Sequence, residues 1–225
     1  KADIVIFITQ DAILAGKSSL KNLLNNFTDN KIAVAYGRQL PRDHATPIEA
    51  FGRIFNYPET ADTRTLQDKG RLGMKVAFCS DSYAAYRVAH ILNNNAAPDR
   101  SIVGEDYITA GNVLLSGFAV RYEASATVKH SHDYTLNQEF RRYFDIGVFH
   151  QEYVSLIIQL GTTEKVGGDF IKSEMKYLLK HNPKLIPLAI LRTACKYIGY
   201  KLGKHSSWFS IKRKRQLSLH PFYFK

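Results

Sequence analysis

The stretch ADIVIFITQDA, residues 2–12, joins an extended apolar run to a carboxylate and decides how the rest of the fold is interpreted. Residues 2–9 are rich in β-branched side chains and apolar almost throughout, which is typical of a strand buried on both faces of a sheet. Asp11 follows shortly after this run. The stretch therefore predicts a buried strand with an acidic side chain at its end.

The next segments alternate between helical and extended patterns. Residues 17–27, KSSLKNLLNNF, carry leucines at helical spacing, and residues 31–37, KIAVAYG, read as a second buried strand. Residues 46–58, TPIEAFGRIFNYP, predict a short amphipathic helix with Pro47 in its first turn and Pro58 at its end. A strand, a helix and a strand in this order predict an α/β layer structure.

The middle of the chain repeats this alternation. Residues 76–92 are expected to run from a strand into a helix that Ser80 or Asp81 caps. Residues 106–116 predict a helix that ends at Gly117.

Two further segments complete this part of the chain. Residues 118–132 return to the extended pattern and end in two histidines, His130 and His132. Residues 137–161 carry apolar side chains at helical spacing and predict one long helix.

The positive charge is concentrated in the last quarter of the chain. Residues 171–225 hold 13 lysines and arginines and a single acidic residue, Glu174, whereas residues 1–170 hold 18 basic and 19 acidic residues. We therefore expect a nearly neutral domain at 1–170 and a basic helical tail at 171–225. The 45% hydrophobic content indicates a globular protein. Cys79 and Cys195 match no metal or redox spacing and fit a reducing compartment.

The tail is amphipathic. On a helix over 184–204, Arg192, Lys196, Gly199 and Gly203 share one face, with leucines and tyrosines opposite. The longest uncharged run before Arg192 is seven residues, far short of the roughly 20 that span a bilayer. Basic and apolar side chains together favour an anionic membrane surface as partner, and the alternative is a solvated helix packed back on the domain.

Seven motifs follow one another in an order that indicates a family. They are FITQDA, YGRQLP, EAFGRIFNYP, FCSDSYAAYR, GEDYITA, VKHSHDYT and FRRYFDIGVFH. In this order they resemble bacterial rhamnosyltransferases of the family-2 glycosyltransferases, which build O-antigens and related surface polysaccharides. The resemblance implies a GT-A-like mixed sheet flanked by helices, a nucleotide-sugar donor and an inverting mechanism.

The same resemblance bears on the start of the chain. In the GT-A fold a nucleotide-binding segment precedes the strand that ends in the Asp motif, and here that strand is residues 2–9. The first residues do not have the pattern of a secretory signal, so we expect none. We expect a family member that lacks its first strands, either as a fragment or as a truncated protein, with an unpaired strand edge.

The GED motif carries the predicted catalytic carboxylates, Asp106 and Glu105. The resemblance implies that Asp106 is the base that takes the proton from the acceptor hydroxyl, a role worth about 10²–10⁴ in rate. Glu105 is expected to hold the acceptor or to orient its neighbour. The alternative is that both acids complement the helix dipole, worth about 0.3–1 kcal/mol each.

The resemblance also implies a divalent cation, Mg²⁺ or Mn²⁺, on the donor diphosphate. Asp11 matches the end of the Asp motif, but Thr9 stands where a second Asp is common, which weakens the predicted site. His130, with His132 as the second choice, is expected to complete the metal or diphosphate site. Asp11 otherwise caps the turn after its strand.

The remaining predicted contacts are polar side chains on the same motifs. Arg141 or Arg142 is expected to bind phosphate, because guanidinium grips phosphate oxygens bidentately. Ser80, Asp81 and Gln10 are expected at the donor. The predicted acceptor contacts are Arg38, Gln39, Glu49 and Arg53. Local packing and capping are the alternative role for these four.

The resemblance therefore implies an enzyme that moves L-rhamnose, or a related deoxysugar, from dTDP-rhamnose or a similar donor to a lipid-linked glycan. We expect it in the cytoplasm, peripheral on the inner face of the bacterial cytoplasmic membrane. One alternative is an inactive, truncated transferase that scaffolds polysaccharide assembly. Another is a nucleic-acid binder, which the IKRKR cluster at 211–215 favours and the balanced charge of 1–170 opposes.

Overall fold

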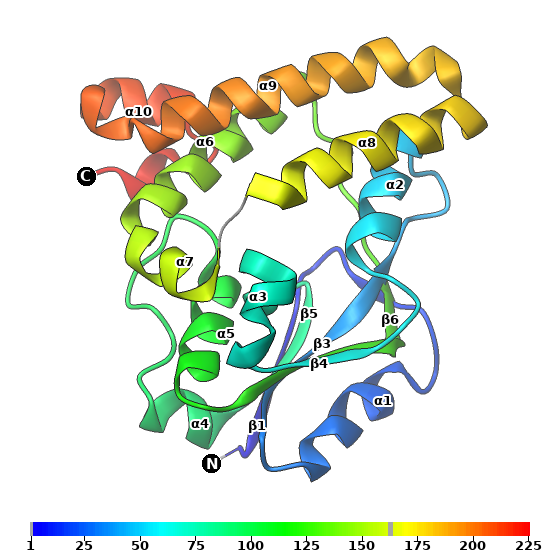
Figure 1. Ribbon diagram of the computed structural model, residues 1–225, viewed down its shortest axis with the longest axis vertical. Helices are drawn as coiled ribbons and strands as arrows, with labels where there is room; N and C mark the ends of the chain where they lie inside the picture. Colours follow the sequence, from blue (N-terminus) through cyan, green and yellow to red (C-terminus); the bar gives the residue numbers. More distant parts are fainter. Residues whose placement is uncertain (1, 162–163) are drawn as a thin grey trace.

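The computed structural model describes residues 2–161 and 164–225 and contains one mixed sheet with helices on both faces (Figure 1). The strands run in the order β1-β5-β3-β6-β2, and β4 pairs with β6. Only β3 and β6 pair in parallel among these strands. The bounds are β1 Ile4–Ile8, β2 Ile13–Leu14, β3 Ile32–Leu40, β4 Asp62–Arg64, β5 Tyr83–Arg87 and β6 Ala119–Lys129. The predicted fold, a mixed sheet flanked by helices, is confirmed.

The helices follow the predicted alternation. They are α1 Ser19–Asn25, α2 Pro47–Asn56, α3 Lys69–Leu72, α4 Val88–Asn93, α5 Glu105–Leu115, α6 Leu136–Glu152, α7 Val154–Leu160, α8 Glu164–His181, α9 Ile186–Lys204 and α10 Ile211–Leu217. Short 3-10 turns lie between them, of which η3, Gly73–Ala77, borders a cavity described below. Thr46 caps α2 by accepting from the backbone N–H of Glu49, and Pro47 opens the helix as predicted.

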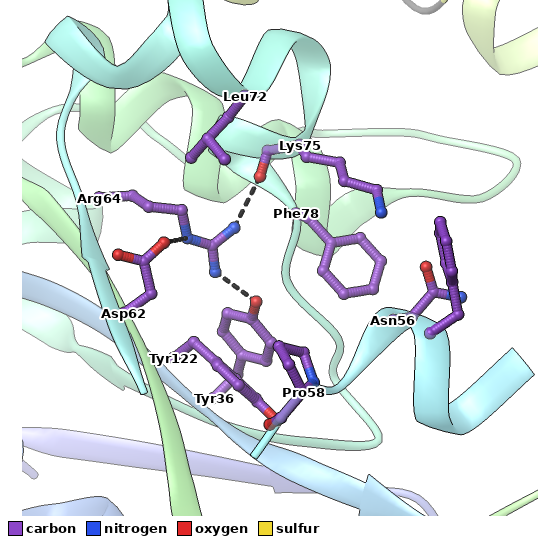
Figure 2. Close-up of a pocket in the computed structure, with 10 residues that line it drawn as sticks. Tyr36, Asn56, Pro58, Asp62, Arg64, Leu72, Lys75, Phe78 and Tyr122 are labelled. Atoms are coloured by element: carbon purple, nitrogen blue, oxygen red, sulfur yellow. Dashed lines mark hydrogen bonds and ion pairs between the residues drawn. The ribbon is translucent and has the colours of Figure 1, made fainter. Parts of the chain in front are cut away.

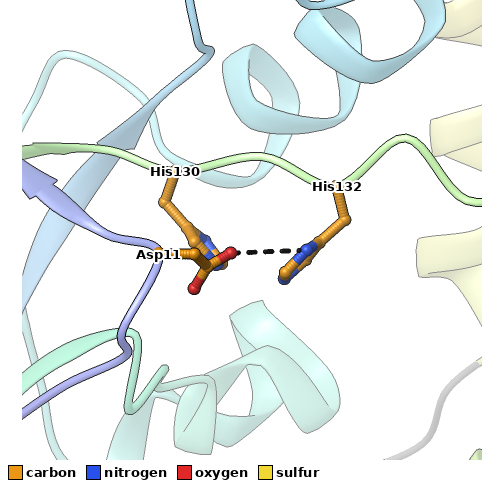
Figure 3. A group of neighbouring side chains, drawn as sticks. All are labelled: Asp11, His130 and His132. Atoms are coloured by element: carbon orange, nitrogen blue, oxygen red, sulfur yellow. Dashed lines mark ion pairs between the residues drawn. The ribbon is translucent and has the colours of Figure 1, made fainter.

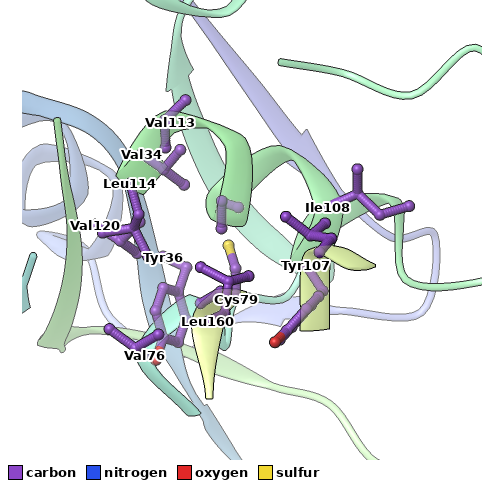
Figure 4. Packing of buried hydrophobic residues seen from close by; sticks show 14 of the residues in the cluster. Val34, Tyr36, Val76, Cys79, Tyr107, Ile108, Val113, Leu114, Val120 and Leu160 are labelled. Carbon is purple, nitrogen blue, oxygen red and sulfur yellow. The ribbon is translucent and has the colours of Figure 1, made fainter. Parts of the chain in front are cut away.

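The core lies on both sides of β3, because successive side chains of a strand point to opposite faces. Val34 and Tyr36 face α5 and pack with its Leu114 (Figure 4). Ala35 faces the other way and packs with Leu23 of α1. The sheet is therefore the middle layer, and its parallel pair β3–β6 is buried as such pairs usually are.

One prediction about the first strand is wrong. The apolar run does form β1, but β1 lies at the edge of the sheet and pairs only with β5 within the described residues. Its side chains from Val5 to Ile8 are 36–49% exposed, not buried on both faces. The apolar run identifies a strand, whereas the order of strands in the sheet decides what covers it.

The prediction that Ser80 or Asp81 caps a helix is also wrong. Both residues precede β5, and α4 begins only at Val88, without a side-chain cap. Ser80 instead accepts a hydrogen bond from Gln39, 41 residues away in sequence, and Asp81 accepts one from Tyr86 in β5.

The single helix predicted over 137–161 is two helices. The chain leaves helical geometry at Tyr153, which separates α6 from α7. The hydroxyl of Tyr153 donates to the carbonyl oxygen of Arg100 at 2.6 Å and so anchors the break to a loop.

The tail helix α9 lies along α6 (Figure 1). The two predicted faces of α9 exist, and the glycine face is turned inward: a Cβ at Gly199 or Gly203 would collide with carbonyl oxygens of α6. On the opposite face Ile190, Leu191 and Tyr197 are 49–61% exposed. In the parts of the chain the structure describes, none of the helices combines the length and the apolar character needed to cross a bilayer.

Candidate active site

Asp11, His130 and His132 form a compact cluster (Figure 3). Asp11 lies in the turn between β1 and β2, and β2 pairs with the end of β6, which places this turn beside the two histidines that follow β6. The carboxylate oxygen Oδ2 of Asp11 lies 3.3 Å from Nε2 of His130 and 3.5 Å from Nδ1 of His132. The three donor atoms are all within 4.8 Å of one another.

This cluster fits a divalent cation. Adjacent ligands of an octahedral ion bound at about 2.1 Å lie about 3 Å apart, close to the spacing found here. His130 is 3% exposed, and its Nε2 has no hydrogen-bond partner among the described residues although it faces the Asp11 carboxylate. Burial, followed by the charge of Arg53, lowers the pKa of His130 to about 4, so its ring is neutral, as a metal ligand must be.

Thr9 acts on this cluster through Asp11. Burial raises the pKa of Asp11, but a hydrogen bond from the Thr9 hydroxyl and the charges of the two histidines outweigh it and leave the pKa below its usual value. At position 9, where the resemblance leads one to expect a second carboxylate, this chain therefore has a hydroxyl that lowers the pKa of Asp11.

Arg42 is a neighbour of the cluster that the sequence analysis did not identify. Its guanidinium donates to the backbone carbonyl oxygen of Asp11 at 2.5 Å and lies 3.5 Å from the Asp11 carboxylate. Nothing in its local sequence distinguishes Arg42 from Arg38, which instead pairs with Glu59 at 3.0 Å.

Asp106 lies in the first turn of α5, half-buried, as the GED motif predicts. Its Oδ1 accepts from its own neighbour, the Tyr107 N–H, at 2.7 Å, and its Oδ2 accepts from the Asp81 N–H at 3.3 Å. Burial, and then the charge of Asp81, raise the pKa of Asp106 to about 7. Glu105 is exposed at the start of the same helix.

A short polar path links Asp106 to the histidine cluster. Ser80, next to Asp81 in the chain, accepts a hydrogen bond from the Gln39 amide at 2.8 Å. The amide oxygen of Gln39 lies 2.9 Å from Nδ1 of His130 and accepts from Arg53 at 2.5 Å. Gln39 was predicted to contact the acceptor, but it is 1% exposed and its amide is occupied inside the protein.

A cavity of about 260 Å³ adjoins the cluster at His132. The predicted site residues Glu49, Arg53 and Arg142 line it, whereas Arg141 is not among its lining residues in the described chain. The tail contributes its far wall through Glu174, Arg192 and Lys196. Residues from both sides of the predicted boundary at 170 therefore meet in this cavity.

The charged side chains of this cavity are partly paired. Glu139 of α6 is 6% exposed, and its Oε1 lies 3.4 Å from both Arg192 and Lys196 of α9. Oε1 of Glu49 is buried without a hydrogen-bond partner in the described chain. Glu49 therefore places an unpaired carboxylate oxygen in the wall of the cavity, where other protein atoms cover it.

A second cavity, of about 150 Å³, lies between β3, β6 and η3 (Figure 2). Arg64 is 4% exposed there and donates to the carbonyl oxygen of Lys75 at 2.6 Å and to the hydroxyl of Tyr36. Through these hydrogen bonds Arg64, the last residue of β4, connects β4 to β3 and to η3. None of the predicted site residues lines this second cavity. The predicted donor contact Gln10 lies elsewhere, exposed in the turn between β1 and β2.

Two curated relatives match nearly the whole chain. The O-antigen chain rhamnosyltransferase RfbN of Salmonella typhimurium (strain LT2) is 41% identical over 223 residues, which are 99% of this chain and 71% of RfbN. The O-antigen chain rhamnosyltransferase WbaN of Salmonella anatum is 39% identical over 224 residues, 100% of this chain and 71% of WbaN. No protein-family model matches the chain.

Two solved structures are more distantly similar. The mannosyltransferase PcManGT from Pyrobaculum calidifontis, in complex with GDP-Man and Mn²⁺, aligns with a TM-score of 0.48 and 15% identity. The alignment covers 100% of this chain and 60% of PcManGT, so this chain spans less than two thirds of that protein. S. aureus TarS 1–349, in complex with UDP-GlcNAc, aligns with a TM-score of 0.38 and 17% identity over 92% of this chain and 68% of TarS.

Proposed function

Because the chain belongs to the family of O-antigen chain rhamnosyltransferases, we propose that it transfers L-rhamnose, or a related deoxysugar, from a nucleoside diphosphate such as dTDP-rhamnose to a lipid-linked glycan. The activity of the family is glycosyl transfer in O-antigen synthesis. We propose in addition the identity of the donor, the identity of the acceptor and an inverting mechanism. One observation supports them most: a carboxylate with a pKa near neutrality is connected to the candidate cation cluster through Asp81, its chain neighbour Ser80 and Gln39.

Asp106 is the proposed base. A base works best when its pKa lies close to the working pH, and burial together with Asp81 brings the pKa of Asp106 to about 7. In the transfer, Asp106 takes the proton of the acceptor hydroxyl while that oxygen bonds to the anomeric carbon and the bond to the diphosphate breaks. Attack from the face opposite the diphosphate inverts the configuration. Glu105, exposed beside it, is proposed to bind the acceptor.

Asp11, His130 and His132 are proposed to hold the cation. When bound, a divalent cation neutralises the charge that develops on the leaving diphosphate. Mg²⁺ prefers oxygen ligands, whereas imidazole nitrogens favour transition metals, so two histidines and one carboxylate favour Mn²⁺ of the predicted pair.

The cavity beside His132 is the proposed place of the remaining contacts. Arg142, which lines it, is proposed for the diphosphate in preference to Arg141. Glu49, with its free carboxylate oxygen, is proposed to accept from acceptor hydroxyls. Ser80, Asp81 and Gln10 remain proposed donor contacts, and Arg38 and Arg53 proposed acceptor contacts.

The outer face of α9, defined as Ile190, Leu191, Tyr197 and Ile198, is the proposed membrane contact. These side chains are 49–61% exposed, and the 13 basic residues of the tail favour an anionic lipid surface. We place the protein on the inner face of the cytoplasmic membrane, where a lipid-linked acceptor resides. The division into a catalytic domain at 1–170 and a membrane-associating tail stays part of this proposal.

The transfer is tested with the full-length protein, dTDP-rhamnose, Mn²⁺ and a lipid-linked acceptor. The expected product carries one added deoxyhexose by mass spectrometry, with the anomeric configuration opposite to that of the donor by NMR. Transfer from another nucleotide sugar but not from dTDP-rhamnose would contradict the proposed donor, and retained configuration would contradict the mechanism.

The membrane contact is tested by flotation with vesicles that contain anionic phospholipid. The double substitution Leu191→Ser and Ile198→Ser is expected to abolish flotation, because it removes apolar burial without changing charge. Leu92→Ser is the matched control, since Leu92 is 72% exposed on α4 at the opposite end of the molecule (Figure 1). Equal flotation of both variants and the unchanged protein would contradict the proposal.

A further inference from the structure

Gln39 occupies the centre of a hydrogen-bond network although it touches neither Asp106 nor Asp11. It lies on β3, is 1% exposed, and both ends of its amide are engaged. Its Nε2 donates to Oγ of Ser80 at 2.8 Å. Its Oε1 accepts from the Arg53 guanidinium at 2.5 Å and lies 2.9 Å from Nδ1 of His130.

These contacts fix the position of a proton on His130. A guanidinium group donates hydrogen bonds and never accepts them, so the Gln39 atom that faces Arg53 is the amide oxygen. The same oxygen faces Nδ1 of His130, which must therefore carry the hydrogen. In a neutral ring the other nitrogen, Nε2, then has a lone pair, and it points at the Asp11 carboxylate 3.3 Å away.

A lone pair and a carboxylate oxygen at this distance repel each other unless a positive charge lies between them. Nε2 is buried and without a hydrogen-bond partner in the described chain, and a cation placed between it and the Asp11 carboxylate would satisfy both atoms. Metal-binding histidines usually donate their second ring N–H to a fixed acceptor, which orients the ring and makes it a better ligand.

We propose that Gln39 is a positioning residue for the cation site: it holds His130 as the Nδ1–H tautomer and directs the Nε2 lone pair to the ion shared with Asp11 and His132. This inference rests on the proposed cation site and adds to it the residue that prepares one ligand. Arg53 acts through Gln39, because its guanidinium decides which way the amide turns.

The second histidine of the cluster is held differently. His132 presents Nδ1, not Nε2, to Asp11, and its ring stacks on Tyr134 with the ring centres 5.2 Å apart. Its side chain is 38% exposed, and no amide holds its other nitrogen in the described part of the chain. Loss of Gln39 should therefore disturb His130 and leave His132 unchanged, which gives an internal reference.

The test compares Gln39→Met with Gln39→Glu. Methionine has a similar length but its thioether sulfur is only a weak acceptor for Nδ1–H, and Mn²⁺ affinity, measured by electron paramagnetic resonance of the free ion, is expected to fall about 10–100-fold. Glutamate keeps the acceptor oxygens and is expected to restore affinity to within about threefold of the unchanged protein. Gln159→Met, on the exposed side of α7, is the matched control and should bind Mn²⁺ normally.

A spectroscopic measurement keeps the inference testable if Gln39→Met does not fold. The ring ¹⁵N shifts of the metal-free, unsubstituted protein are expected to show His130 as the Nδ1–H tautomer, and Gln39→Glu should retain it. An Nε2–H tautomer, or normal Mn²⁺ affinity in a folded Gln39→Met protein, would overturn the inference. If the unsubstituted protein binds no Mn²⁺ at all, the proposed cation site itself fails.

Discussion

Asp106 and Asp11 are the same side chain in opposite electrostatic settings. Asp106 is half-buried next to the acids Asp81 and Glu105, and burial, followed by the charge of Asp81, raises its pKa to about 7. Asp11 is more open to solvent, and a Thr9 hydrogen bond and two imidazoles leave its pKa below the usual value. One carboxylate is thus ready to exchange a proton near neutral pH, and the other stays charged.

This difference assigns the two proposed roles. Where two carboxyl groups of a site have pKa values that are driven apart, the one with the raised pKa suits proton transfer and the permanently ionised one suits a charge-stabilising task. Asp106 therefore suits the base and Asp11 the cation ligand. Substitutions that alter one carboxylate or its surroundings should therefore have different effects on turnover and on cation binding.

The largest effect is expected for Asp106→Asn. Turnover should fall by about 10²–10⁴-fold, because the amide cannot take a proton from the acceptor hydroxyl. Mn²⁺ affinity should stay unchanged, since Asp106 is not part of the cation cluster. Turnover by dTDP-rhamnose assay and Mn²⁺ binding are measured on the same preparation, and full turnover would refute the assignment.

The same variant also has a predicted effect on stability. The folded-state pKa of Asp106, about 7, lies above its ordinary value of 3.8, so the unfolded chain ionises first and stability falls as the pH rises from about 4 to about 7. Asp106→Asn should therefore raise the melting temperature at pH 8 and leave it nearly unchanged at about pH 3, where both states of the unsubstituted protein are largely protonated. This outcome would also show that lost turnover does not come from unfolding.

Asp11→Asn is expected to produce the converse result. It removes the single carboxylate charge from the cluster while keeping the shape of the side chain. Mn²⁺ should bind on the order of 100-fold more weakly, because affinity at such sites depends on ligand charge. Turnover should recover at high Mn²⁺ concentration, which Asp106→Asn cannot do. Failure of added Mn²⁺ to restore any activity would contradict a role through the cation.

The fold was predictable from the sequence wherever the signal is local. The Thr46–Pro47 start of α2 and the buried run of β3 each depend on a few neighbouring residues, and the structure confirms both. The edge position of β1 and the break at Tyr153 depend on partners far along the chain, a strand in one case and the Arg100 carbonyl in the other. Periodicity carries no information about such partners.

The candidate site divides in the same way. The motif order indicated Asp11, His130 and His132 together, and their donor atoms do converge. Arg42 and the role of Gln39 were missed, because both depend on the register between β3 and the end of β6, where Gln39 lies opposite Val128. Sequence patterns identified the two faces of α9 but not which one packs inward. The glycine face packs inward because Gly199 and Gly203 let α9 approach α6 closely, whereas the bulkier apolar face is left outside.

A moderate effect is expected for Asp81→Asn, which reduces the contrast between the two carboxylates. Removing the Asp81 charge should lower the pKa of Asp106, so the acid limb of the kcat/KM profile, expected near pH 7 in the unsubstituted protein, should move to lower pH. Asparagine keeps an oxygen that accepts from the Tyr86 hydroxyl, a bond of 2.5 Å with Asp81. Because Asp81 is also a proposed donor contact, the position of the limb, not the height of the profile, is the measurement. A limb that stays in place would show that another group titrates.

The smallest effects are expected for substitutions of Thr9, whose hydrogen bond lowers the pKa of Asp11. Thr9→Val removes the hydroxyl that bonds to Asp11 and keeps the β-branched shape, so Mn²⁺ affinity should fall about two- to fivefold at pH 7.5 as the carboxylate loses one hydrogen bond. Thr9→Asp should raise the affinity by a similar factor, because it adds a second charged oxygen ligand beside Asp11. The opposite signs make the pair informative, since a general disturbance of the turn would weaken binding in both variants. Equal weakening by valine and aspartate would mean that Thr9 supports the backbone after β1 and does not act on the Asp11 carboxylate.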